Sequence, residues 1–343
     1  MRIPETYLLS AGAALPGPAV DNAALARRFG MDTLWEQWVD VFVGTRQRHL
    51  CVDLASGELR SNLADLATAA AQQALKSADL TPDDIDVIVM STATPDQLMP
   101  ATVNVVADQL GVNDLPTYQL QTGCAGAVQA LDVAQALLTT GRHRTALVLG
   151  GDVCAKYFDL SLDLAALPPA QLINVVLFGD GAGAAVLSSE PGPGRVVIRR
   201  LLNRLTGRGR APGHVLDWFG LADRDSLRPA AAEDYKAIEE SVPRMAGEIL
   251  RELLDDLGWQ DDDVDYLLPP QLSVRMTSRI VDQLGLPGAL EVSCISETGN
   301  NGNALPFLQL ERLLRRMAGG DRAVGLAVES SKWLKAGYAL EKL

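Results

Sequence analysis

Cys124 is the residue whose type and surroundings best suit nucleophilic chemistry. It lies in the segment TYQLQTGCAGAVQALDVAQALL (117–138), whose pattern predicts a strand, a tight turn and a helix, and its small neighbours Gly123 and Gly126 let a substrate approach the sulfur. The positive end of a helix dipole favours thiolate over thiol, and backbone N–H groups there can hold a developing oxyanion. A small buried apolar side chain is the alternative interpretation, and the local sequence leaves both open.

Few other residues offer acid–base or metal chemistry. The three histidines are His49, His143 and His214, so a mechanism that needs an imidazole must use one of them. The four cysteines contain no CxxC pair, which argues against a disulfide scaffold and against a zinc site. We therefore expect no metal centre and a reduced, cytoplasmic protein.

An internal duplication supplies the elements that would position Cys124. Matched segments occur twice, in the same order and at a nearly constant offset. They are an amphipathic helix (64–78 and 236–258), an acidic turn that leads into a buried strand (81–90 and 260–269), a Thr-Gly-Cys or Thr-Gly-Asn turn (122–124 and 298–300), a following helix (126–140 and 304–318) and a second strand (143–152 and 321–330).

These repeats predict two copies of a βαβ-rich unit, over residues 1–190 and 195–343, in which helices cover the sheets. The PGPGR segment at 191–195 is a suitable hinge because Pro and Gly interrupt both element types. Pseudo-twofold symmetry would place Cys124 and Asn300 at corresponding points, each between a strand end and a helix start, where functional groups gather in α/β folds. The alternative is that the two halves look alike only because α/β proteins in general share such patterns through their composition.

Composition narrows the class of partner. The 343 residues carry a net charge of -13, and 48% are hydrophobic, which is typical of a globular protein with room for two domains. The acidic balance disfavours nucleic acid as a partner. No apolar run approaches the roughly 20 residues that span a bilayer, and the N-terminus is a poor signal peptide, so we expect no membrane association.

The segment TGCAGAVQAL resembles the nucleophile segment of the thiolase-fold condensing enzymes, specifically β-ketoacyl-acyl-carrier-protein synthase III. Four further segments resemble segments of that family: VGTRQRH (43–49), VIVMSTATPDQLMPAT (87–102), LFGDGAGAAVL (177–187) and TGNNGNALP (298–306). The last of them has one residue deleted relative to the family. The resemblance therefore covers essentially the whole chain. It implies an α/β fold, the five-layered αβαβα thiolase fold with two pseudo-twofold-related halves, and a C2 homodimer. It also implies Cys124 as nucleophile and Asn300 at the position of the family asparagine.

The same resemblance implies the substrate class. No cofactor would be bound permanently, and the substrate would be a phosphopantetheine-linked thioester on acyl carrier protein or coenzyme A. The glycines of 177–184 lack the lysine and the context of a nucleotide-binding loop, so we interpret them as sites of close backbone packing.

The family histidine is missing from this chain. Its Pro-His-Gln-Ala-Asn run corresponds to Leu-Pro-Pro-Gln-Leu-Ser at 268–273, which puts Pro270 where the histidine should stand. In the family, histidine and asparagine together hold the enolate oxygen formed when a malonyl thioester is decarboxylated, and loss of one such donor costs roughly 10²–10³ in rate. An acyl-cysteine needs only a thiolate, an oxyanion hole and a thioester leaving group. This departure favours acyl transfer or ring formation over ordinary decarboxylative condensation.

The glycine-rich run that supplies the family's second oxyanion N–H is also changed. Its place is taken by ESSKW (329–333), so the expected oxyanion hole combines the backbone N–H of Cys124 with one from Ser330 or Ser331.

Two side chains are candidates for the missing base. Glu329 would act as a partly buried carboxylate with a raised pKa, or else it caps a turn or pairs with Lys332 or Lys335. His214 lies in the loop RAPGHVLDWFG (210–220), a region near the acyl entrance in the family.

Two groups of residues are candidates for substrate or carrier binding. The arginine-rich stretch 195–210 could bind an acidic carrier protein or the phosphate of phosphopantetheine, because both are negatively charged. The alternative is that the stretch is a solvated charged edge. In the family, a tryptophan and an arginine near the early segment contact coenzyme A, although a core role for the tryptophan is equally consistent. The residues singled out are Arg199, Arg200, Arg204 and Arg208 in the stretch, and Trp38 and Arg46 in the early segment.

The favoured function is an acyltransferase of the synthase III type in polyketide, antibiotic or other specialised biosynthesis. Cys124 would pass an acyl group to an oxygen, nitrogen, sulfur or carbon nucleophile, including ring-forming reactions such as tetronate formation from a glyceryl thioester. A decarboxylating condensing enzyme with Glu329 or His214 as base is one alternative. A non-catalytic subunit that stabilises an active paralogue is the other.

Overall fold

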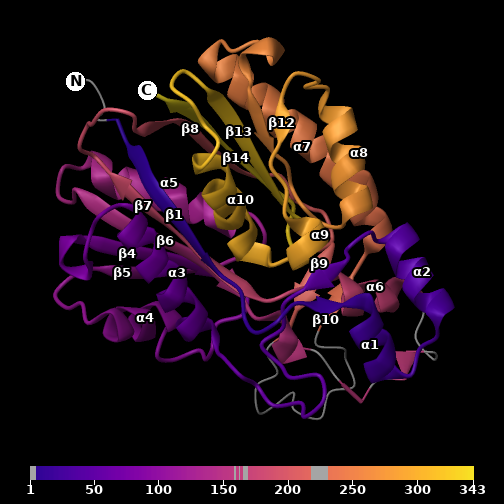
Figure 1. Ribbon diagram of the computed structural model, residues 1–343. Helices are drawn as coiled ribbons and strands as arrows, with labels where there is room; N and C mark the ends of the chain where they lie inside the picture. Colours follow the sequence, from indigo (N-terminus) through magenta and orange to yellow (C-terminus); the bar gives the residue numbers. More distant parts are fainter. Residues whose placement is uncertain (1–4, 158–159, 162, 165–168, 218–230) are drawn as a thin grey trace.

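The strands of the two halves join in one ten-stranded sheet, ordered β12-β11-β13-β14-β8-β1-β7-β6-β4-β5 (Figure 1). The computed structural model describes residues 5–157, 160–161, 163–164, 169–217 and 231–343. The strands of one half are β1 (Tyr7–Ala14), β4 (Val87–Thr92), β5 (Thr117–Gln121), β6 (Thr145–Asp152) and β7 (Gly181–Ser188). Those of the other are β8 (Val196–Leu205), β11 (Tyr266–Leu268), β12 (Leu290–Glu291), β13 (Arg322–Glu329) and β14 (Leu334–Lys342).

The sequence duplication is a duplication of topology. The order β1-β7-β6-β4-β5 matches β8-β14-β13-β11-β12, and in each half the first two pairings are antiparallel and the last two parallel. The two halves meet at a short antiparallel pairing of β1 with β8. This arrangement confirms the predicted α/β fold with two related halves. The limits 1–190 and 195–343 stay a prediction, consistent with the Pro/Gly segment lying between β7 and β8.

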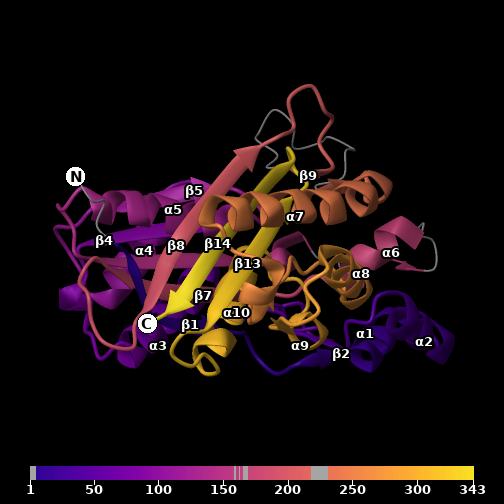
Figure 2. The ribbon, with the colours of Figure 1, turned by 90° about the horizontal axis from the view of Figure 1, so that it is seen from above.

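Helices complete the five predicted layers (Figures 1 and 2). In the middle lie α5 (Gly126–Thr139), packed on β4, β6 and β8, and α10 (Leu305–Leu314), packed on β1 and β7. The outer layer of the first half contains α3 (Leu63–Ser77) and α4 (Thr102–Leu110), and that of the second contains α7 (Tyr235–Leu257) and α8 (Val274–Leu284). Figure 2 shows α7 lying across β8, β14 and β13.

The middle layer requires apolar helices and close approach of the backbone. The central core combines residues of α5 and α10 with both parts of the sheet. A Cβ on Gly183 would lie 2.4 Å from the Cβ of Phe307, and one on Gly150 would lie 2.5 Å from its ring. The interpretation of the 177–184 glycines as close-packing residues is therefore confirmed for Gly183. The helix predicted over 304–318 is shorter than expected and ends at Leu314.

Smaller elements complete the described structure, and some of them line the cavity described below. They are β2 (Val20–Asp21), β3 (Gln47–Arg48), α1 (Asn22–Phe29), α2 (Thr33–Phe42), α6 (Pro169–Leu177), α9 (Ile295–Thr298) and the hairpin of β9 (His214–Leu216) with β10 (Ala231–Glu233). Residues of α1, α2 and α6 share a hydrophobic cluster of their own. Among the described residues, none of the helices has the length and apolarity needed to cross a bilayer.

Truncation of Phe307 is expected to destabilise the fold strongly. The side chain is fully buried between the two halves, and a buried Phe→Ala change costs about 3–5 kcal/mol. We expect Phe307→Ala to lower the free energy of unfolding in urea by that amount. Leu205→Ala, at a side chain that is 68% exposed, is the control and should change it by less than about 0.5 kcal/mol. Equal effects of the two variants would contradict this account of the core.

Candidate active site

Cys124 and Asn300 lie in the wall of one cavity of about 530 Å³. Cys124 occupies the turn between β5 and α5, and Asn300 lies between α9 and the start of α10, at the corresponding point of the other half. The cavity also contains two further residues singled out from the sequence, His214 and Ser330. The structure thus brings together side chains from both halves that are far apart in the chain.

Glu329 lies directly against the turn that carries Cys124. Its Oε2 accepts hydrogen bonds from Thr122 Oγ1 and the backbone N–H of Gly123, each at 3.0 Å, and from the N–H of Ala125 at 3.4 Å. The hydroxyl of Ser331 donates to its other oxygen. The carboxylate is buried at the end of β13 and caps the turn at the start of α5. Turn capping was one of the interpretations left open.

The alternative ion pairs of Glu329 do not form. Lys335 Nζ instead contacts Glu248 at 3.1 Å and Glu252 at 2.7 Å. Lys332 Nζ donates to the carbonyl of Arg210.

The expectation of a thiolate at Cys124 is wrong. Burial, and then the carboxylates of Glu329, Asp152 and Glu233, raise the pKa of the Cys124 thiol to about 12. The helix dipole does not reverse this, because the N–H groups at the start of α5 already donate to Glu329. The resting thiol is therefore neutral near pH 7, and its attack on a thioester requires a base.

Asn300 lines the cavity together with Cys124. Its Oδ1 accepts a hydrogen bond from the N–H of Gly302 at 3.0 Å, which fixes the orientation of the amide. Its Nδ2 donates no hydrogen bond to the residues that the structure describes. This N–H group can bind an oxygen of a substrate.

Pro270 stands beside the nucleophile. Together with Cys124 and Asn300 it lines a second, small cavity of about 30 Å³. Its ring has no group that donates, accepts or transfers a proton. The side-chain amides that line this small cavity are those of Asn300, Gln271 and Gln309.

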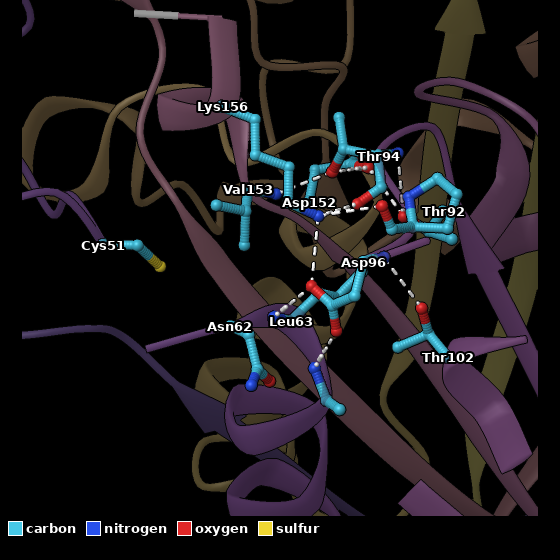
Figure 3. A network of polar contacts seen from close by, with 12 residues as sticks. Cys51, Asn62, Leu63, Thr92, Thr94, Asp96, Thr102, Asp152, Val153 and Lys156 are labelled. Carbon is cyan, nitrogen blue, oxygen red and sulfur yellow. Dashed lines mark hydrogen bonds and ion pairs between the residues drawn. The ribbon is translucent and has the colours of Figure 1, made fainter. Parts of the chain in front are cut away.

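A buried network that sequence reasoning missed is centred on Asp152, and it connects the two halves through Asn303. Figure 3 shows the part of it that lies in the first half. Asp152 Oδ1 accepts hydrogen bonds from Thr92 and Thr94 and from the N–H of Ala93. Its Oδ2 accepts from the backbone and side-chain N–H groups of Asn303, at 2.8 and 2.9 Å. Asn303 Nδ2 also donates to the carbonyl of Thr122. The only sequence signal is that polar residues follow or end strands at these positions.

The network extends to the start of α3, as Figure 3 shows. Lys156 Nζ donates to the carbonyl of Thr94 at 2.8 Å and to Asp96 at 3.1 Å. Asp96 in turn accepts from the N–H groups of Leu63 and Ala64. These contacts fix the loop after β4 against the first helix of the outer layer.

His214 is held by a partner that the sequence did not indicate. Its Nδ1 lies 3.4 Å from Glu233 Oε1 on the neighbouring strand, and both side chains line the cavity. Residues 218–230 separate the two in the chain, and the part of the loop 210–220 that follows Asp217 lies outside the described residues.

The oxyanion hole stays a prediction. Ser330 lines the cavity, and its carbonyl accepts a hydrogen bond from the N–H of Gly213. Ser331 uses its hydroxyl to contact Glu329. The N–H of Cys124 is placed in the same wall.

The residues predicted to bind the carrier or coenzyme A do not line this cavity. Arg199 pairs with Glu5 and Glu341, Arg200 with Asp256 and Arg204 with Glu252, while Arg208 is exposed. The basic stretch is thus largely neutralised by acidic neighbours. Trp38 packs in a tilted contact with Phe42, and Arg46 is exposed. The basic residues of the cavity wall are instead Arg275 and Arg279 of α8.

The titration of Cys124 tests the electrostatics of the site. We expect the thiolate absorbance of the wild type, taken as the difference from Cys124→Ala, to rise only towards pH 12. The variant Glu329→Gln removes a nearby negative charge and should lower this pKa, so that more thiolate is present at a given alkaline pH. A wild-type titration below the ordinary value of 9.0 would contradict the assignment.

Comparison with known proteins gives the family. Models of 3-oxoacyl-[acyl-carrier-protein] synthase III and of its C-terminal part match residues 118–201 and 254–330. The chain is 35% identical to β-ketoacyl-[acyl-carrier-protein] synthase III 3 of Streptomyces coelicolor over 93% of this chain and 92% of that one.

Solved structures agree with this result. AbyA1, a tetronic acid condensing enzyme, is 61% identical with a TM-score of 0.96, and the match covers 98% of this chain and 99% of that one. The priming β-ketosynthase of the R1128 polyketide pathway is 27% identical with a TM-score of 0.83, over 100% of this chain and 98% of that one. The chain therefore has the thiolase-like fold and belongs to the β-ketoacyl-[acyl-carrier-protein] synthase III family of acyltransferases.

Proposed function

We propose that this acyltransferase carries an acyl group on Cys124 and passes it to a carbon nucleophile without decarboxylation, the first bond-forming step that tetronic acid formation needs. The observation that carries the proposal is the shared cavity of Cys124 and Asn300 in which Pro270 replaces the family histidine. The similarity to a tetronic acid condensing enzyme supports the same reaction class. The donor would be a thioester of acyl carrier protein or coenzyme A, with no permanently bound cofactor.

In the first half of the reaction, the Cys124 sulfur attacks the thioester carbonyl. Glu329 takes the thiol proton, because its carboxylate is fixed by contacts on both sides of the nucleophile, at Gly123 and Ala125. The carbonyl oxygen becomes an oxyanion held by the N–H of Cys124 and one from Ser330 or Ser331. The thiolate of phosphopantetheine then leaves and takes up a proton.

In the second half, the acceptor attacks the acyl-cysteine and Cys124 leaves as a thiol. Asn300 Nδ2 donates to the oxygen of the acceptor on which negative charge develops. A malonyl thioester would need a second donor at this oxygen, and its loss costs roughly 10²–10³ in rate. An acceptor whose carbon is already acidic can be deprotonated instead of decarboxylated, and it suits this site better.

The second candidate is a decarboxylating enzyme with a substitute base, favoured by the presence of His214 in the same cavity. Release of carbon dioxide from a malonyl thioester by the wild type, abolished in His214→Gln, would establish that function instead. A non-catalytic subunit is the remaining alternative, and it predicts no adduct on Cys124.

Carrier docking and a homodimer in the cytoplasm belong to the same proposal. Arg275 and Arg279 suit the phosphate of phosphopantetheine better than the arginines of β8 do, because they line the cavity that holds Cys124. The strand β5 ends the sheet with its backbone unpaired on one side, and Tyr118 on it is 42% exposed. Two copies joined at β5 would continue the sheet.

Intact-protein mass spectrometry tests the covalent intermediate. After mixing with acetyl, malonyl, glyceryl and longer acyl thioesters of coenzyme A and carrier protein, we expect a mass gain in the wild type that is absent in Cys124→Ala. Cys154→Ala removes another thiol, one that is partly buried, and should keep the adduct. We expect Glu329→Gln to slow acylation by about 10²–10⁴, the usual contribution of a general base. An unchanged activity of Cys124→Ala would refute the mechanism.

The dimer is tested by light scattering. We expect the wild type to have twice the mass of one chain. Tyr118→Lys places a charge on the exposed face of β5 and should shift the protein towards the monomer, because edge lysines oppose strand pairing. A wild type that is monomeric at micromolar concentration would contradict the proposed dimer.

A further inference from the structure

The second half of the proposed reaction needs a base for the acidic carbon of the acceptor, and the wall of the main cavity contains few groups that can act as one. Glu329 lines neither cavity, and both of its oxygens already accept hydrogen bonds. Glu239 lies in the wall but is 59% exposed and forms an ion pair. Glu233 is only 6% exposed, and its Oε2 is buried. Among the described residues of the wall, this leaves His214, whose side chain is 22% exposed.

The short β9–β10 hairpin fixes the imidazole of His214. His214 and Glu233 lie directly opposite each other in the hairpin, and His214 Nδ1 is 3.4 Å from Glu233 Oε1. A carboxylate beside Nδ1 favours the neutral tautomer that carries its proton on that nitrogen, so the lone pair of Nε2 is available to accept a proton. The same carboxylate stabilises the imidazolium that forms when Nε2 is protonated. Burial, and then Glu233, raise the pKa of the Tyr235 phenol, so the carboxylate also lies close to the start of α7.

Phe178 connects His214 to the amide of Asn300. The Phe178 ring makes a tilted contact with the imidazole, with ring centroids 6.4 Å apart. The backbone of the same residue forms a parallel bridge with Asn300. The N–H of Asn300 donates to the carbonyl of Leu177 at 2.9 Å, and the N–H of Gly179 donates to the carbonyl of Asn300 at 3.1 Å. One short segment therefore positions the imidazole and the amide in the wall of the same cavity.

We propose that His214 is the base that removes the proton from the acceptor carbon, and that Glu233 is its positioning residue. This inference rests on the proposed function, in which a carbon nucleophile attacks the acyl group on Cys124. The carbon-bound proton moves to His214 Nε2, and the electron pair left behind forms an enolate whose oxygen accepts a hydrogen bond from Asn300 Nδ2.

The enolate carbon then forms a bond to the carbonyl carbon of the acyl group, and the bond from that carbon to the Cys124 sulfur breaks. The sulfur takes up one proton from water in the cavity, and the imidazolium of His214 releases one to water. The protons therefore balance, and no oxidant or reductant is needed.

The test measures the two half-reactions separately. The enzyme is first acylated on Cys124 with a thioester, and the excess donor is removed by gel filtration. It is then mixed with acetoacetyl coenzyme A, whose α-carbon lies between two carbonyl groups. Mass spectrometry follows the loss of the acyl group from the protein and the appearance of the carbon-acylated product. A sample without acceptor gives the rate of hydrolysis.

Variants of the proposed base should affect only the second half-reaction. His214→Gln keeps hydrogen-bonding groups but cannot take up a proton. We expect it to be acylated at the wild-type rate and to transfer the acyl group about 10²–10⁴ times more slowly, the usual contribution of a general base. Glu233→Gln should also slow the transfer, because the imidazolium loses its counter-charge. His143→Gln, at a histidine that does not line the cavity, is the matched control and should change neither rate.

Chemical rescue separates a catalytic role of His214 from a structural one. Imidazole added to His214→Ala should restore part of the transfer rate, because a free base can then accept the proton in the space left by the side chain. Thermal unfolding checks the fold of each variant, and His214→Gln decides if the Ala variant does not fold.

Two results would overturn the inference: transfer at the wild-type rate in His214→Gln, or an equal slowing of both half-reactions that imidazole does not rescue in His214→Ala. The absence of any Cys124 adduct in the wild type is a different result, because it refutes the proposed function on which the inference rests. Release of carbon dioxide from a malonyl thioester would refute that function as well.

Discussion

One buried carboxylate, that of Asp152, holds the two halves of the active site together. It accepts hydrogen bonds from the end of β4 on one oxygen and from Asn303, at the start of the α10 region, on the other. Asn303 also donates to the carbonyl of Thr122, next to the catalytic turn. Burial raises the pKa of Asp152, and these hydrogen bonds lower it. A buried charge is tolerated only when it is hydrogen-bonded, so the loop after β4 and the segment before α10 must both pack against the Asp152 carboxylate. This packing brings Cys124 and Asn300 to the wall of the same cavity.

The surroundings of Cys124 are negatively charged and do not stabilise a thiolate. The start of α5 has the N–H groups that would favour a thiolate, but Glu329 accepts their hydrogen bonds. With a carboxylate at that place and further acids nearby, the neutral thiol is the stable form of Cys124. Reactivity therefore depends on proton transfer during attack, and not on a standing negative charge.

The fold is retained although one of its usual functional groups is lost. Pro270 lines the small cavity beside Cys124, and the surrounding helices and strands keep the arrangement of the family. What changes is the number of donors that a substrate oxygen meets, since Asn300 remains and the imidazole does not. In the wall of the main cavity, Glu233 and His214 add polar groups. Chemistry is thus altered by a few side chains on an unchanged scaffold.

The sequence alone determined the layered α/β fold, the turn that presents Cys124, the matching position of Asn300 and the absence of the histidine at Pro270. The two α/β halves, the turn at Cys124 and the position of Asn300 follow from local periodicity and from the internal repeat. The five layers and the missing histidine follow from the resemblance to the synthase III family. Only the tertiary structure decided that Glu329 contacts Gly123, 206 residues away in the chain. It also decided the pairing of His214 with a neighbouring strand, the neutralised arginines and the direction of the Cys124 pKa. Such properties depend on which distant segments pack together and how much water they exclude, and no local pattern specifies either.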